Sequence, residues 1–113
     1  MANAFGIPEN ELKKIRARDN RCVYCHKKMI HPYNTKNRRD SATIEHLNFD
    51  GPFYWSDEGF KIEDIVYCCA SCNSSRGIKK LPVWFESDYC KSRNINEKTV
   101  ADPVKKYLKR KKI

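Results

Sequence analysis

The feature that most constrains this chain is a pair of CxxC motifs, Cys22–Cys25 and Cys69–Cys72, which are separated by residues 26–68. Two such pairs can supply four thiolates to one tetrahedral zinc ion. A chain of 113 residues buries a modest core, and small domains often need a metal or a disulfide to stabilise them. The sequence therefore predicts a structural Zn²⁺ site that joins two distant segments.

The second cysteine pair has two registers, because Cys68 directly precedes Cys69. We prefer Cys69, since its spacing to Cys72 repeats the spacing of the first pair. Cys68 and Cys90 are then expected to be buried or idle thiols. Two other interpretations are less favoured. Residues 22–26 match the CxxCH of haem attachment, but haem leaves the second pair unexplained, and a thioredoxin-like redox motif would need a βαβ unit.

Length and charge limit the class of protein. We expect a single domain over residues 1–113, with a core at about 20–80 and a helical extension at about 81–113. The net charge of +9 and the isoelectric point near 9.3 favour nucleic acid as a partner. We see neither a membrane-spanning stretch nor a secretory signal, so we expect no membrane partner and a reducing, cytoplasmic location of a bacterial or phage type.

Hydrophobic patterns and turn residues predict an α+β fold. Helices are expected at residues 8–19, 70–76 and 82–92, and from residue 102 onward. Residues 41–47 read as a strand, and residues 62–67 as either a strand or a helical turn. The segments 29–40 and 48–59 are expected to be loops. Phe53, Tyr54 and Trp55 in the second loop are expected to pack there rather than to stack on bases.

Three polar residues stand where the zinc motifs would bring them together. Glu45 and His46 lie between the motifs, and Asn73 directly follows Cys72. An imidazole can take a proton from water, and carboxylate and amide oxygens are ligands for Mg²⁺ or Mn²⁺. A general base, a divalent metal and a basic surface together are typical of phosphodiester hydrolysis. An acid beside a histidine can also be a structural pair, and the position of Asn73 favours the catalytic interpretation.

Residues 22–77 resemble the zinc-containing HNH endonucleases of the ββα-metal superfamily. The motifs that carry the resemblance are CVYC at 22–25, ATIEHL at 42–47 and IEDIVYCCASCNSSRG at 62–77. The resemblance implies a β-hairpin followed by a helix that together hold a catalytic metal. It also implies that a separate structural zinc braces this unit.

The resemblance implies a role for each matching residue. His46 is the general base, and Glu45 and Asn73 are ligands of a catalytic Mg²⁺ or Mn²⁺. Asp64 stands where the family often has an asparagine that orients the active-site loop, and Arg76 stands at a position that often contacts a DNA phosphate. Glu45 replaces the usual aspartate and Asp64 replaces a neutral amide, which makes these the two departures from the family pattern.

The expected function is a divalent-metal-dependent endonuclease that nicks or cleaves DNA, and Lys79, Lys80, Arg38, Arg39 and Arg76 are its candidate DNA contacts. Further cations are Lys36 and the basic run 109–112. The alternative is an inactive, zinc-stabilised module that binds nucleic acid. RNA as substrate, and a protein partner or homodimer for targeting, stay open.

Overall fold

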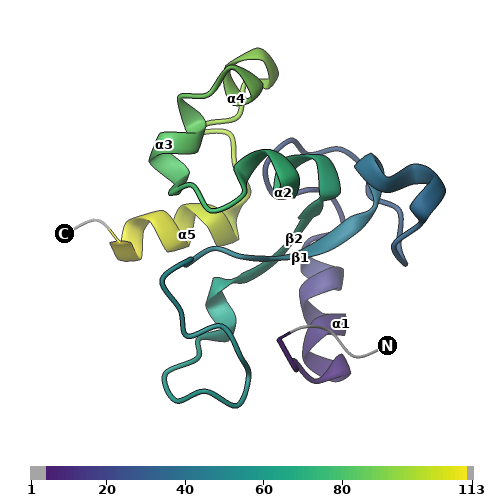
Figure 1. The fold of residues 1–113 in the computed structure, drawn as a ribbon, viewed down its shortest axis with the longest axis vertical. Coiled ribbons are helices and arrows are strands. Elements are labelled where there is room, and N and C mark those ends of the chain that lie inside the picture. The colour runs from purple at the N-terminus through teal and green to yellow at the C-terminus, as the bar shows by residue number, and fades with distance from the viewer. Residues whose placement is uncertain (1–4, 112–113) are drawn as a thin grey trace.

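The computed structural model describes residues 5–111 and contains one two-stranded sheet with helices on both sides (Figure 1). In chain order its elements are α1 (Glu9–Arg18), η1 (Thr35–Asp40), β1 (Ala42–His46), η2 (Ile62–Asp64), β2 (Ile65–Cys69), α2 (Ala70–Arg76), α3 (Leu81–Phe85), α4 (Asp88–Arg93) and α5 (Asp102–Lys111), where η marks a 3₁₀ helix. The predicted α+β class is confirmed.

β1 and β2 form an antiparallel pair in which Ala42 faces Cys69 and His46 faces Ile65. Successive side chains of a strand point to opposite faces of a sheet. Glu45 therefore points to one face of the pair, and its neighbour His46 points to the other. This alternation decides the surroundings of the two residues that the sequence places side by side.

Each face of the pair is covered by a separate hydrophobic cluster. α1 packs on one face, where Leu12 and Ile15 join Ile65 and Tyr67. The repeat of apolar residues on α1 at i and i+3 explains this contact, since these positions share one side of a helix. The second cluster lies on the face of Val66 and Cys68, and its largest members are Tyr24, Leu47, Leu81, Trp84, Ile95, Val100 and Val104.

α2 follows directly from β2, and the sequence specifies both of its ends. The Sγ of Cys69 accepts a hydrogen bond from the backbone N–H of Cys72 at 3.4 Å, so a zinc-motif thiol also caps the helix. Gly77 ends the helix with φ 55° and ψ −124°, a conformation that strains residues with a Cβ. The predicted helix at 70–76 is confirmed with these bounds.

Two segments differ from the predictions, and a third combines two predicted alternatives. The single helix expected at 82–92 is two helices, α3 and α4, because the hydroxyl of Ser87 caps a new helix by accepting from the N–H of Cys90 at 3.3 Å. The loop expected at 29–40 contains η1, whose first turn is capped by Asn34. Residues 62–67 were expected to form either a strand or a helical turn, and they contain both, since η2 leads directly into β2.

The C-terminal extension is tied to the first cysteine motif. The N–H of Ala101 donates to the carbonyl oxygen of Val23 at 2.8 Å, and the ring of His26 hydrogen-bonds the carbonyl oxygen of Thr99. Val100 and Val104 are buried in the same cluster as Val23. α5 is therefore held against the core. No helix within residues 5–111 has the length and apolar composition needed to cross a bilayer.

Candidate functional site

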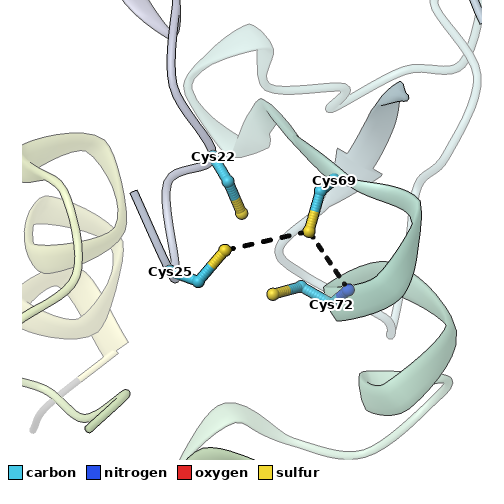
Figure 2. Close-up of side chains that lie close together, drawn as sticks. All are labelled: Cys22, Cys25, Cys69 and Cys72. Carbon is cyan, nitrogen blue, oxygen red and sulfur yellow. Dashed lines mark hydrogen bonds between the residues drawn. The ribbon is translucent and has the colours of Figure 1, made fainter. Parts of the chain in front are cut away.

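The four predicted cysteines converge at the start of α2 (Figure 2). Their sulfur atoms all lie within 4.8 Å of one another, and the Sγ atoms of Cys25 and Cys69 are 3.9 Å apart. Four sulfurs at about 2.3 Å from a tetrahedral zinc ion would be about 3.8 Å apart. Cys22, Cys25, Cys69 and Cys72 could therefore hold a metal such as zinc.

A metal binds the thiolate form of cysteine, and the four thiols differ in how readily they lose a proton. Hydrogen bonding with Cys22 lowers the pKa of Cys69 to about 7 and lowers the pKa of Cys25 as well, whereas hydrogen bonding within the cluster raises the pKa of Cys22 and that of Cys72. Cys25 is only partly buried, whereas Cys22, Cys69 and Cys72 are buried. The cluster is thus largely enclosed, as expected of a structural site with four protein ligands.

The structure resolves the register of the second cysteine pair in favour of Cys69. Cys68 points to the opposite face of β2, where its Sγ lies 3.7 Å from the hydroxyl of Thr43, and burial raises the pKa of this thiol. Cys90 is buried against the larger hydrophobic cluster. Neither thiol belongs to the four-cysteine cluster, as predicted.

Glu45, His46 and Asn73 share the lining of one cavity of about 270 Å³. β1 supplies the first two residues at its end and α2 supplies the third, so the hairpin and the helix that follows it bring them together. The remaining lining is largely aromatic and apolar: Phe5, Ile44, Phe49, Phe53 and Tyr54. The two segments that carry Glu45, His46 and Asn73 thus contribute side chains to the same cavity.

His46 is 4% exposed and lies within a shell of phenylalanine rings. The ring centroids of Phe5, Phe53 and Phe60 are 5.8, 5.2 and 6.0 Å from that of His46, all in edge-to-face arrangements. Neither ring nitrogen makes a hydrogen bond of good geometry to a described residue, although backbone groups of Pro52 and Asn48 lie near the ring. Burial lowers the pKa of His46, while the Asp64 carboxylate opposes this shift. The imidazole is therefore kept neutral near pH 7.

Glu45 is 2% exposed and faces α2 and the first cysteine motif. Its Oε2 accepts hydrogen bonds from the Tyr24 hydroxyl at 2.8 Å and from Nη1 of Arg76 at 3.2 Å. Burial raises the pKa of Glu45, and the Arg76 guanidinium and Tyr24 hydroxyl oppose that effect. The carboxylate is thus paired inside the protein, although it also borders the cavity.

Asn73 is oriented by contacts with β1. Its Nδ2 donates to the hydroxyl of Thr43 at 3.0 Å and to the carbonyl oxygen of Ile44 at 3.3 Å. These bonds use the donor end of the amide, and no described residue donates a hydrogen bond to the oxygen Oδ1. A carbonyl oxygen of this kind is a suitable ligand for Mg²⁺ or Mn²⁺.

Asp64 does not line the same cavity as the other three residues. It is 4% exposed, its Oδ1 accepts from Nη2 of Arg110 at 2.9 Å, and its backbone oxygen accepts from the N–H of Leu47 at 2.8 Å. The backbone bond connects Asp64 to the residue after His46. Asp64 thus supports the loop that leaves β1, while its charge acts on His46 from outside the cavity.

Arg76 requires a correction among the predicted DNA contacts. It is 1% exposed, and its guanidinium donates to Glu45 and to the carbonyl oxygens of His46, Leu47 and Lys79. The guanidinium of Arg76 holds β1 against α2 and is covered by protein. The other four candidates, Arg38, Arg39, Lys79 and Lys80, are exposed.

Three contacts that shape the site were not predicted from the sequence. Tyr24 bonds Glu45, Arg110 pairs with Asp64, and the Tyr89 hydroxyl lies 3.3 Å from Sγ of Cys72. Tyr24 lies inside the CVYC motif, so the sequence could have indicated that it is close to the site. Arg110 belongs to the basic run 109–112 that the sequence offered as possible DNA contacts, but its pairing with Asp64 was not predicted. That pairing, like the position of Tyr89, depends on helices that are distant in the chain.

Comparisons of this chain with protein-family models, with curated proteins and with solved structures find no match.

Proposed function

We propose that this protein is a divalent-metal-dependent HNH-type endonuclease that hydrolyses phosphodiester bonds in DNA. The observation that carries the proposal is the shared cavity of Glu45, His46 and Asn73 at the junction of β1 and α2. In this proposal β1, β2 and α2 form the ββα-metal core, and the cysteine cluster holds a structural Zn²⁺ that fixes the start of α2.

His46 is assigned as the general base. A base must be neutral to accept a proton from water, and burial lowers the pKa of this imidazole. Its ring nitrogens are unpartnered among the described residues, so one of them can accept that proton. Since His46 is almost fully covered by phenylalanine rings, DNA would have to displace part of this cover.

Asn73 and Glu45 are assigned as the residues that would hold Mg²⁺ or Mn²⁺. Oδ1 of Asn73 is oriented by the two bonds of its Nδ2, and both hydrogen bonds to Glu45 fall on Oε2, so Oε1 is the oxygen that would bind the metal. A divalent metal bound there would stabilise the charge that develops on the phosphate and the leaving oxygen. Asp64 is assigned as a positioning residue for the loop after β1.

The second candidate is a zinc-stabilised module that binds nucleic acid without cleaving it. The observation that favours it is the burial of Glu45 with Arg76 and Tyr24, since a carboxylate already neutralised by arginine is a weaker metal ligand. The net charge of +9 suits both candidates. Salt-sensitive binding without product in any divalent metal would favour this module.

A supercoiled-plasmid assay on zinc-loaded protein, with Mg²⁺, Mn²⁺ or no added metal, tests the proposal. The unchanged protein is expected to nick or linearise the plasmid only with metal. His46→Ala is expected to lower the rate by about 10²- to 10⁴-fold, the usual contribution of a general base. His31→Ala is the matched control, because His31 is exposed and does not line the cavity.

Equal rates for the unchanged protein and His46→Ala would remove the proposed mechanism. DNA binding with no cleavage by any variant would select the binding module. Competition between DNA and RNA of the same sequence distinguishes the two substrates.

A further inference from the structure

A second cavity, of about 260 Å³, lies between the loop 48–59 and the end of α5. The proposed reaction does not use it. Its lining consists of Asn48, Gly51, Pro52, Gly59, Lys61, Asp64, Arg110 and Lys111. Three of these side chains are cationic and one is anionic, so the cavity carries a surplus of positive charge.

Arg110 is the most specific of the three cations. Its Nη2 donates to Oδ1 of the buried Asp64 at 2.9 Å, and its side chain is 37% exposed. A guanidinium has five N–H donors in a planar fork, and the contact with Asp64 uses one of them. The remaining donors suit an anion such as phosphate, which guanidinium groups bind in two-pronged geometry.

The cavity adjoins His46. Asn48 lines the cavity and lies two residues after His46, and Pro52 precedes Phe53, whose ring centroid is 5.2 Å from that of His46. Asp64, also in the lining, accepts from the N–H of Leu47 through its backbone oxygen at 2.8 Å. An anion held by Arg110 would therefore be bound next to the proposed base. This position is suited to a phosphate of a nucleic-acid backbone that passes through the proposed active site.

We propose that this cavity is a phosphate-binding subsite in which Arg110, assisted by Lys61 and Lys111, binds one backbone phosphate of DNA. Asp64 holds the guanidinium in place when DNA is absent and competes with the phosphate for it. The inference rests on the proposed function in one respect only, that DNA is the partner.

The test measures binding of a short fluorescent DNA duplex by anisotropy, without added divalent metal, between about 50 and 200 mM salt. Losing one phosphate contact lowers the slope of log affinity against log salt by about 0.9. Arg110→Gln is expected to show this loss, and Arg110→Lys to retain most of the slope. Lys106→Gln is the matched control, because Lys106 is exposed on the same helix and does not line the cavity.

A double-mutant comparison tests the competition with Asp64. Asp64→Asn is expected to strengthen DNA binding in the chain with Arg110 and to have no effect in the Arg110→Gln background. An equal effect in both backgrounds, or equal slopes for Arg110→Gln and Lys106→Gln, would overturn the proposal. Thermal unfolding of each variant shows whether its fold is intact, and Arg110→Lys keeps the test decisive if Arg110→Gln is unstable.

Inorganic phosphate separates a backbone subsite from a free-anion site. If inorganic phosphate stabilises the protein only when Arg110 is present, but the salt slope of DNA binding does not depend on Arg110, the assignment of DNA as the ligand is overturned. The absence of any salt-sensitive DNA binding would overturn it as well. The two proposals fail separately. If the salt slope depends on Arg110 but the protein never nicks DNA, the phosphate subsite is supported and the nuclease proposal fails. If nicking depends on His46 but the salt slope does not depend on Arg110, the nuclease proposal is supported and the subsite fails.

Discussion

His46 combines burial, an aromatic shell and two unpartnered ring nitrogens, and this combination has a consequence for stability. The pKa of His46 is lowered in the folded chain from its ordinary value of 6.5, so the unfolded chain binds the proton more readily. Where the unfolded state binds more protons, the free energy of unfolding rises with pH. The contribution of His46 is therefore lost as pH falls below 6.5 toward the folded-state pKa.

We predict that the unchanged protein loses more stability between pH 7.5 and 5.5 than His46→Gln, which has no proton to bind there. Urea unfolding of both zinc-loaded proteins at several pH values measures the difference, and effects of pH on the shared zinc site cancel. His31→Gln, a change at an exposed histidine, is expected to behave as the unchanged protein does. The same pH dependence in all three proteins would contradict this account of His46.

At the scale of elements, the Arg76–Glu45 pair joins α2 to β1. Both side chains are 2% exposed, and Nη1 of Arg76 lies 3.2 Å from Oε2 of Glu45. Removing one partner of a buried ion pair leaves an uncompensated charge and typically costs about 3–5 kcal/mol. Replacing both partners by neutral groups removes that cost, so the effect of the double change is smaller than the sum of the single changes.

We predict that Arg76→Met lowers the free energy of unfolding by about 3 kcal/mol or more and that Glu45→Gln/Arg76→Met restores a large part of it. Chemical denaturation of the single and double variants gives the coupling energy. Lys91→Met at the exposed pair with Glu86 is the control, and its cost is expected to be below about 1 kcal/mol. Additive costs for Arg76 and Glu45 would show that the pair does not join the two elements.

At the scale of the whole molecule, the cysteine cluster links the first cysteine motif to the start of α2, and the C-terminal extension is bonded to the same motif. Metal binding in small zinc domains contributes about 10–16 kcal/mol, which is comparable to the entire stability of a domain. Loss of a bound zinc would therefore affect the core as well as the cluster.

We predict that the purified chain contains one zinc ion and that a strong chelator abolishes its near-ultraviolet circular dichroism, which reports on packed aromatic residues such as Trp84. Cys69→Ala is expected to lose the metal, while its neighbour Cys68→Ala is expected to retain it. Metal analysis and circular dichroism of the two variants check this. Retention of zinc by Cys69→Ala would contradict the assigned register.

Much of the fold and the metal cluster could be predicted because their signals are local. The spacing of Cys22, Cys25, Cys69 and Cys72 fixes which thiols can share a metal, and the cap at Cys69 and the glycine at position 77 fix the ends of α2. The break at Ser87 was missed, since a serine that caps a helix also occurs within helices, and neighbouring sequence alone does not separate the two.

The surroundings of the candidate catalytic residues depend on packing between distant segments, which no local pattern reports. Adjacent residues of a strand point to opposite faces, so Glu45 meets Tyr24 and Arg76 while His46 meets phenylalanine rings. The same packing buries Arg76, which the sequence suggested as a DNA contact, and brings Arg110 to Asp64. Residue types and spacing thus specified which groups are present, and tertiary packing decided their partners and their exposure to solvent.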